Sequence, residues 1–263
     1  MNRERIFFEK YQGTGNDFIL IDDRQGHFPS VDSSLVKKLC ARHYGVGSDG
    51  LILIRKSFHL DFHMDFFNPD GSTSFCGNGS RCAVLFARSL GMFQGEKCKF
   101  SAIDGQHEAL VLDQEIRVKM RDVGNCVVDG NEIEIFTGSP HFLSFGSTLP
   151  VGDIRGSARE IRYSEKYAEK GINVNFVAPD ARGIAMRTYE RGVEDETLSC
   201  GTGVTAAALG AALKYALTSP IHVSTAGGLL KVHFAMSGQS SFRDIWLEGP
   251  AIKVFEGSIT LSV

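Results

Sequence analysis

Apolar and polar residues alternate along many short segments of this chain. The pattern is clearest at residues 60–66, where leucine, phenylalanine and methionine are separated by aspartate and histidine, and it recurs at 115–120 and 132–136. Alternation with a period of two predicts β-strands with one buried face. Further strands are predicted at the ranges 18–22, 51–55, 108–112, 172–177, 184–189, 221–225, 229–235 and 243–248, and a last segment, 252–259, could return to the sheet of the first half.

A helical pattern is convincing in three places. The first predicted helix runs from about residue 33 to residue 43, because apolar residues recur there on one face. The other two begin at Cys76 and Cys200 and end at Gly91 and before Pro220, which are residues typical of helix ends. The chain is therefore expected to contain many strands and few helices.

The helix after Cys200 differs from an ordinary surface helix, because residues 201–213 carry no charge. A helix without a polar face has to be enclosed by the rest of the protein, and strands wrapped around it would enclose it. The helix after Cys76 carries Arg81 and Arg88. We expect it to be less completely enclosed, or to present these arginines at one edge.

The two cysteine-headed helices form part of an internal repeat. Cys76-Gly-Asn-Gly matches Cys200-Gly-Thr-Gly, 124 residues later. Two weaker matches have nearly the same offset and the same order: 15–18 with 138–142, and 45–49 with 171–175. Three matches at one offset indicate a duplicated chain. We predict one domain from residues 1–122 together with 254–263, and a second domain from residues 123–253.

The composition is that of an ordinary globular protein, with 43% hydrophobic and 22% charged residues. A net charge of −3 argues against nucleic acid as the main partner. The charged N-terminus does not have the apolar core of a signal peptide, and no uncharged stretch is apolar enough to cross a membrane, so a cytoplasmic protein is expected. No Cys-x-x-Cys pair occurs among the six cysteines, and no metal site is predicted.

A cysteine at a helix N-terminus has a particular chemistry. Unsatisfied backbone N–H groups and the positive end of the helix dipole lower the pKa of a thiol there. The Gly-x-Gly that follows lets the same N–H groups approach a carboxylate closely. Two such sites could hold one amino acid, with one thiolate removing its α-proton and an opposing thiol protonating the other face.

The α-proton of an amino acid is weakly acidic, so the carbanion needs stabilisation. No lysine lies in a context that indicates a pyridoxal Schiff base, and no cofactor is predicted. Amides of two helix N-termini, aimed at the α-carboxylate in a cavity closed to water, are the available means. The sequence therefore predicts stereoinversion of a small-molecule amino acid.

The chain resembles the diaminopimelate epimerases, enzymes without a cofactor that interconvert LL- and meso-diaminopimelate in lysine and peptidoglycan precursor synthesis. The resemblance runs nearly from end to end. It rests on seven motifs in order, at residues 10–18, 42–49, 68–72, 76–81, 171–176, 187–192 and 196–203. The resemblance implies a pair of pseudo-symmetric α/β (α+β) domains, each a barrel-like, mainly antiparallel sheet around a central helix, with the site in the cleft between them. A homodimer is left as a candidate assembly.

The resemblance also implies roles for individual residues. Cys76 and Cys200 would be the acid/base pair, with His141 and Glu190 near the two thiols to set their protonation states. The α-carboxylate would be bound by backbone amides of Gly77, Asn78, Gly201 and Thr202. The distal end of the substrate would be held by Asn16, Asn68, Asn173 and Arg191, with Glu190 close by. Each of these residues could instead have a purely structural role. Asn68 and Asn173 could be turn residues, Arg191 could form a surface ion pair, and His141 could be a structural histidine.

One position departs from the family pattern. Where relatives have Gly-Asn-Pro-His, this chain has Ser139 in Gly-Ser-Pro-His, so a hydroxyl replaces an amide that contacts the substrate. A hydroxyl is shorter and has fewer donors. We therefore expect some tolerance for other diacidic amino acids, including glutamate.

Two other functions stay open at this point. A proline-racemase type of isomerase also has a cysteine pair, although it would not need Arg191 and the distal asparagines. The related phenazine-pathway type lacks the two-cysteine arrangement, so the presence of both Cys76 and Cys200 argues against it. A protein that binds an amino acid without chemistry could use the same helix N-termini.

Overall fold

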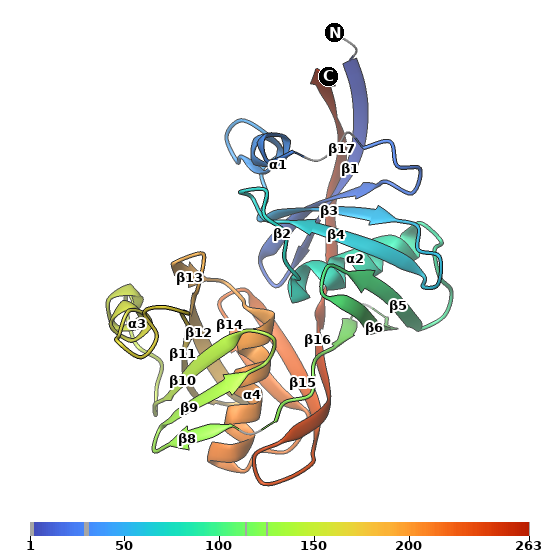
Figure 1. Cartoon of the computed structure of the whole chain (residues 1–263). Helices are drawn as coiled ribbons and strands as arrows, with labels where there is room; N and C mark the ends of the chain where they lie inside the picture. The colour runs from blue at the N-terminus through green and yellow to red at the C-terminus, as the bar shows by residue number, and fades with distance from the viewer. Residues whose placement is uncertain (1–2, 29–31, 114, 125, 263) are drawn as a thin grey trace. The chain divides into compact units, whose positions relative to one another are not determined.

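Each half of the chain folds a sheet around a helix, as the computed structural model shows for residues 3–28, 32–113, 115–124 and 126–262. Residues 1–118 together with 250–263 form one compact unit, and residues 119–249 form the other. Figure 1 labels the elements of both units. Strands dominate and helices are few, which confirms the predicted α/β (α+β) class.

The described residues of the first unit form two helices and eight strands: β1 (Arg3–Gly13), β2 (Asn16–Asp22), α1 (Ser33–Cys40), β3 (Gly50–Arg55), β4 (Phe62–Phe67), α2 (Gly77–Ser89), β5 (Lys97–Ala102), β6 (Gly105–Leu112), β7 (Glu115–Lys119) and β17 (Ile252–Ser262). Along the chain, β1 and β2 are antiparallel, β2 and β3 parallel, β3 and β4 antiparallel, β4 and β5 parallel, and β5, β6 and β7 antiparallel. The last strand, β17, returns to pair with β1.

The second unit contains β8 (Val127–Asp129), β9 (Glu132–Phe136), β10 (Pro140–Phe145), α3 (Arg155–Arg162), β11 (Asn173–Asp180), β12 (Gly183–Glu190), β13 (Asp195–Thr197), α4 (Gly201–Tyr215), β14 (Ile221–Thr225), β15 (Gly228–Met236) and β16 (Phe242–Pro250). The pairings from β9 to β16 repeat the order seen from β1 to β7: antiparallel, parallel, antiparallel, then parallel across the cysteine-headed helix, then twice antiparallel. This common topology confirms the two pseudo-symmetric halves.

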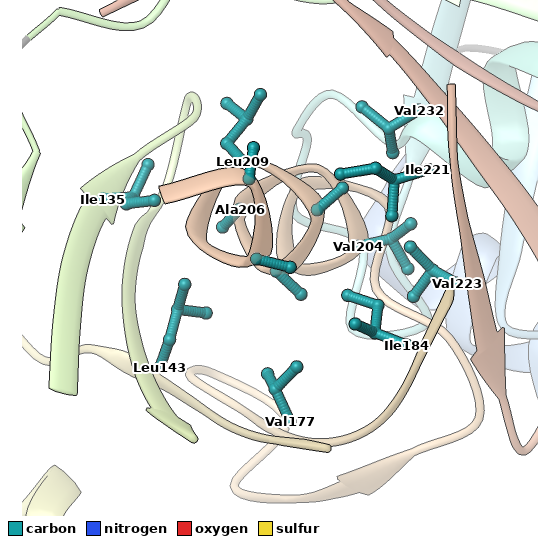
Figure 2. Packing of buried hydrophobic residues seen from close by; sticks show 14 of the residues in the cluster. Ile135, Leu143, Val177, Ile184, Val204, Ala206, Leu209, Ile221, Val223 and Val232 are labelled. Atoms are coloured by element: carbon teal, nitrogen blue, oxygen red, sulfur yellow. The ribbon is translucent and has the colours of Figure 1, made fainter. Parts of the chain in front are cut away.

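The strands of the second unit enclose α4. Val204, Ala206 and Leu209 of this helix have no exposed surface, and they pack against inward-facing residues of the surrounding strands. Figure 2 shows this cluster with the helix at its centre; among the strand residues are Ile135, Leu143, Val177, Ile184, Ile221, Val223 and Val232. Burying a side chain of this kind contributes about 1.5–3 kcal/mol. The absence of a polar face therefore predicted the enclosure correctly.

The corresponding helix of the first unit, α2, buries one of its two arginines. Arg88 is exposed but Arg81 is fully buried, so the alternative in which α2 presents both arginines at one edge is wrong, while its exposed last turn at Arg88 and Ser89 agrees with the other alternative, a less complete enclosure. The Arg81 guanidinium donates to the Thr14 hydroxyl at 3.0 Å and to the Pro250 carbonyl at 3.3 Å. These acceptors allow a cation to be buried, and burial lowers the pKa of Arg81.

A second, smaller helix covers the outer face of each sheet. In the first unit α1 begins at Asp32, whose carboxylate accepts from the N–H of Leu35 at 2.7 Å, and it ends at Cys40 instead of residue 43. The equivalent helix α3 was not predicted from the sequence. Its apolar stripe consists only of Ile154 at the N-cap, Ala158 and the partly buried Ile161, which is short and lies among charged residues.

The parallel strand β3 shows how each sheet serves two layers. Its residues Ile52 and Ile54 belong to the core around α2, and Leu51 and Leu53 belong to the core under α1. All four are fully buried, so this strand reads as a continuous apolar run. Among the described residues, no helix has the length and apolar character needed to cross a membrane.

Candidate active site

Cys76 occupies the N-cap position of α2 in the first unit and is half-buried. Its extended backbone leaves the sulfur beside the first turn, where the N–H of Gly79 donates to Sγ at 3.4 Å. The thiol in turn lies 3.9 Å from Oδ1 of Asn16, which can accept its proton. The sulfur therefore has a donor on one side and an acceptor on the other.

The orientation of Asn16 is fixed by its neighbours. Its Nδ2 donates to a carboxylate oxygen of Asp49 at 2.7 Å, so its Oδ1 is the atom turned toward Cys76 and toward Nδ2 of Asn78. Arg42 pairs with Asp49 at 2.6 Å and holds this carboxylate in place. The structure thus brings together three predicted site residues, Asn16, Cys76 and Asn78, while Gly77 opens the helix.

Asn68 lies in a separate turn of the first unit. Its side-chain amide donates to the hydroxyls of Ser72 and Ser74, at 3.1 Å in each case, and its backbone N–H donates to the carbonyl of Ser72 at 2.8 Å. These contacts are those of a turn residue. Its predicted contact with the substrate stays a prediction.

Cys200 occupies the N-cap position of α4 in the second unit and is buried. No backbone N–H of the first turn caps this sulfur. Instead, the Thr202 hydroxyl lies 3.5 Å from Sγ. Gly203 has to be small here, because a Cβ at this position would lie 2.8 Å from Oδ1 of Asn175 and 3.3 Å from Cε1 of His141.

Glu190 supplies the acceptor for Cys200. The carboxyl group of this residue, at the end of β12, is hydrogen-bonded to Cys200, and its Oε2 also accepts from the Thr197 hydroxyl at 3.0 Å. Burial raises the pKa of Glu190, although these two hydrogen bonds oppose the shift. A carboxyl with a raised pKa can both accept a proton from the sulfur and return it.

His141 lies in β10 with no exposed surface. Burial lowers the pKa of His141 to about 3, and the positive charge of Arg191 adds to this effect. Its Nε2 lies 2.9 Å from the Thr202 hydroxyl, and its Nδ1 lies 3.2 Å from Nδ2 of Asn175. His141 therefore reaches Cys200 through Thr202 and is a neutral ring at ordinary pH.

Asn173, Ser139 and Arg191 form a second group in this unit. Oδ1 of Asn173 accepts from the backbone N–H of Arg191 at 2.9 Å, and its Nδ2 donates to the Ser139 hydroxyl at 2.8 Å. The Arg191 guanidinium donates to the Lys170 carbonyl at 2.9 Å. Gly171 has a φ of +68° and makes room for this side chain, since a Cβ there would lie 2.7 Å from Cδ of Arg191.

The two sulfurs have matching environments in their own units. Cys76 has the Gly79 N–H as donor and Asn16 as acceptor, and Cys200 has Glu190 as acceptor and the Thr202 hydroxyl, which can donate or accept, 3.5 Å from its sulfur. A hydrogen-bond donor near the sulfur favours the thiolate form of the cysteine, and a hydrogen-bond acceptor favours the thiol form. Each of the two cysteines can therefore exist in either form. In the described part of the chain, no group of three or more His, Cys, Asp and Glu side chains is arranged to hold a metal ion.

Two solved structures share this fold along nearly the whole chain. A phenazine biosynthesis protein of the PhzF family from Bacillus anthracis matches with a TM-score of 0.72 at 12% identity, over 98% of this chain and 100% of that chain. A hydroxyproline epimerase from Agrobacterium vitis, solved with trans-4-hydroxy-L-proline, matches with a TM-score of 0.63 at 14% identity. The match covers 100% of this chain and 93% of that chain. The chain therefore has the two-domain fold of these proteins.

Sequence comparison identifies the family. The sequence model of diaminopimelate epimerase matches residues 8–126 and 135–254. The diaminopimelate epimerase of Flavobacterium psychrophilum is 44% identical over 254 residues, covering 95% of this chain and 98% of that protein. The diaminopimelate epimerase of Aquifex aeolicus is 40% identical over 284 residues, covering 97% of this chain and 98% of that protein. The chain belongs to the diaminopimelate epimerase family of isomerases, which confirms the resemblance seen in its motifs.

Three residues that touch this site were not predicted from the sequence. Asp49 orients Asn16, and Asn175 contacts His141 while it accepts from the Thr188 hydroxyl at 3.0 Å. Asp49 and Asn175 lie inside motifs that carry the family resemblance. Their positions in the sequence do not indicate which side chains they hydrogen-bond to. Thr188 lies inside such a motif as well. Their contacts depend on strand pairing between distant segments.

Proposed function

We propose that this enzyme interconverts LL-2,6-diaminopimelate and meso-diaminopimelate by a two-cysteine acid/base mechanism without a cofactor. Membership of the family supports the substrate and the reaction. The observation that carries the mechanism is the repeated position of Cys76 and Cys200: each is the N-cap of an inner helix, at the same place in the topology of its unit, with a hydrogen-bond acceptor at its sulfur.

In this mechanism one sulfur is a thiolate and the other a thiol when the substrate binds. The thiolate removes the α-proton, the electron pair stays on the α-carbon as a carbanion, and the thiol delivers its proton to the opposite face. After one turnover the former thiolate is a thiol and the former thiol is a thiolate. The enzyme must therefore either return these protons to their starting positions or catalyse the reverse epimerisation. The hydrogen-bonding partners at each sulfur suit this exchange.

The carbanion is the difficult species. We propose that the backbone amides at Gly77, Asn78, Gly201 and Thr202 bind the α-carboxylate and stabilise the negative charge that develops next to it. Losing one donor of an oxyanion hole typically costs about 2.7–4 kcal/mol. Because one cysteine lies in each unit, the mechanism requires a substrate that is bound by residues of both units.

The distal amino-acid group of the substrate gives the specificity. We propose that the Arg191 guanidinium pairs with its carboxylate, that Glu190 or its carbonyl meets its ammonium group, and that Asn16, Asn68, Asn173 and Ser139 contribute polar contacts. A proline-type substrate would leave these groups unpaired, and unpaired polar groups are costly in a closed site. This favours diaminopimelate over a proline-type substrate.

The direct test is conversion of LL-diaminopimelate to the meso isomer, followed by chiral chromatography without added pyridoxal phosphate. Wild-type enzyme should convert it, and Cys76→Ala and Cys200→Ala should not. Cys126→Ala is the matched control, because this half-buried cysteine lies in the second unit and heads no helix, and it should keep wild-type activity. Binding of LL-diaminopimelate by calorimetry without conversion would support a binding protein, and racemisation of proline alone would support the proline-racemase type.

We also propose a cytoplasmic location, where a lysine and peptidoglycan precursor is made, and a homodimer. Light scattering after gel filtration tests the assembly. A mass near twice 28.8 kDa is expected for the homodimer, and a mass near 28.8 kDa would contradict it.

A further inference from the structure

Asn175 is a buried side chain with a single possible orientation. Its Nδ2 lies 3.0 Å from the carbonyl oxygen of Phe142, which can only accept, so this atom is the amide nitrogen. Its Oδ1 accepts from the hydroxyl of Thr188 at 3.0 Å. Asn175 and Thr188 face each other directly across the antiparallel strands β11 and β12, so both partners are set by the sheet.

This orientation determines which nitrogen of His141 carries the proton. The same Nδ2 of Asn175 lies 3.2 Å from Nδ1 of His141, and because Nδ2 is a donor, Nδ1 has to be an acceptor. A neutral imidazole with an unprotonated Nδ1 carries its hydrogen on Nε2. His141 has no exposed surface, so no solvent competes for these bonds.

The next member of the chain of contacts is the Thr202 hydroxyl. Nε2 of His141 lies 2.9 Å from Oγ1 of Thr202 and donates to it. The hydrogen of the hydroxyl then has to point away from the ring, and Sγ of Cys200 lies 3.5 Å from the oxygen. The hydroxyl is therefore a donor to the sulfur and stabilises it as thiolate.

We propose that Asn175, held by Thr188, is a positioning residue that fixes His141 in the Nε2–H tautomer and thereby directs the Thr202 hydroxyl hydrogen at the Cys200 sulfur. This inference rests on the proposed function of Cys200 as an acid/base group. His141 then acts as a fixed donor in the network and takes no proton from the sulfur. The charged groups beside the network are Glu190, hydrogen-bonded to Cys200, and Arg191, whose charge acts on His141.

Asn175→Asp tests the inference with a side chain of the same shape. An ionised carboxylate has no N–H, so it accepts from Nδ1 of His141 and moves the ring proton to that atom. Nε2 then becomes an acceptor and draws the Thr202 hydrogen away from Cys200. Thr188→Val removes the hydroxyl that anchors Asn175, and Thr188→Ser keeps it, so this pair separates loss of the hydrogen bond from loss of packing.

Nitrogen NMR of the histidine-labelled enzyme gives a readout that a merely structural role would not move. At neutral pH, wild-type enzyme should show one ring, assigned by its loss in His141→Gln, with a protonated Nε2 and an unprotonated Nδ1. Asn175→Asp should place a proton on Nδ1. A wild-type ring protonated at Nδ1 would overturn the inference, whether or not the enzyme is active.

Kinetics complete the test. A hydrogen bond to a charged group corresponds to roughly a 10- to 100-fold change, so Asn175→Asp and Thr188→Val should lower kcat by that factor, with a smaller change in KM. Thr188→Ser should restore most of the rate. Unchanged kcat in both Asn175→Asp and Thr188→Val would overturn the positioning role. Absence of diaminopimelate conversion by wild-type enzyme would instead overturn the proposed function, and the NMR result would still decide the tautomer.

Discussion

The side-chain amide of Asn173 donates a hydrogen bond to the hydroxyl of Ser139 at 2.8 Å. The other end of the same amide accepts from the backbone N–H of Arg191 at 2.9 Å, so Asn173 links Ser139 to the arginine that we propose binds the distal carboxylate. The family resemblance described above implies an asparagine at the position of Ser139. If residue 139 contacts the substrate as we propose, the serine hydroxyl offers one hydrogen-bond donor fewer than an asparagine amide would.

We predict that this difference broadens the specificity. Wild-type enzyme should racemise glutamate slowly, and Ser139→Asn should lower the ratio of glutamate to diaminopimelate activity by about 2- to 10-fold, the range for one neutral hydrogen bond. Paired assays of kcat/KM with both substrates measure this. An absence of glutamate racemisation above background, together with an unchanged rate for diaminopimelate in Ser139→Asn, would rule the idea out.

Gly203 should tolerate no side chain. Its Cβ would lie 2.8 Å from Oδ1 of Asn175, so Gly203→Ala should shift this side chain, lower activity and reduce the free energy of unfolding by about 1–3 kcal/mol. Urea denaturation measures the change. Gly156→Ala is the control, because Gly156 lies exposed in α3 with nothing within 4 Å of its Cβ position, and it should stabilise by about 0.4–1 kcal/mol. Equal stability of both variants would contradict the packing described here.

The buried ring of His141 should make stability depend on pH. Its pKa is lowered to about 3 in the folded protein, against about 6.5 in the unfolded chain. Below about pH 6.5 the unfolded chain takes up a proton that the folded protein does not, so the free energy of unfolding falls as the pH drops toward about 3.

The measurement is denaturant unfolding at pH 7 and pH 5 of wild type, His141→Gln and His27→Gln. The first variant removes the buried ring and should lose less stability than wild type on acidification. The second changes an exposed histidine and should behave like wild type. An equal loss in wild type and His141→Gln would show that the ring is not held neutral.

Oxidation should inactivate the enzyme if both sulfurs act on one carbon. Thiols that approach a single small molecule from two sides can form a disulfide when the site is empty, provided their Cβ atoms come within about 3.5–4.5 Å. We expect an air-oxidised, inactive sample to contain a crosslink between Cys76 and Cys200, seen by mass spectrometry without reductant, and activity to return with a thiol. An inactive oxidised sample without this crosslink would argue against a disulfide between Cys76 and Cys200 as the cause of inactivation.

Some features of the fold can be read from local sequence. The helix after Cys200 has no charged residue, so the sequence alone predicts that the surrounding strands bury it. The repeated Cys-Gly-x-Gly motif is also visible in the sequence. Features that depend on distant partners could not be predicted. Strand β10 is buried on both faces, with Phe142 in the core under α3 and Leu143 in the core around α4, so it has no alternation to detect. Arg81 is buried because Thr14 and Pro250 supply acceptors.

The candidate site shows the same division. The cysteines could be selected because their helix positions and glycines have a local signature. The network behind Cys200 has none, since it joins His141 of β10, Asn175 of β11, Thr188 of β12 and Thr202 of α4. Only the pairing of three strands brings these side chains together.

The central claim is that Cys76 and Cys200 act on opposite faces of one α-carbon, and hydrogen exchange tests it most directly. LL-diaminopimelate is incubated with enzyme in D₂O and analysed at low conversion. The account predicts deuterium at the α-carbon of newly formed meso-diaminopimelate, while the remaining LL isomer keeps its hydrogen, because the removed proton and the delivered deuteron reside on different sulfurs. Deuterium appearing equally fast in the remaining LL isomer and in the product, or undiminished epimerisation by Cys76→Ala or Cys200→Ala, would contradict it.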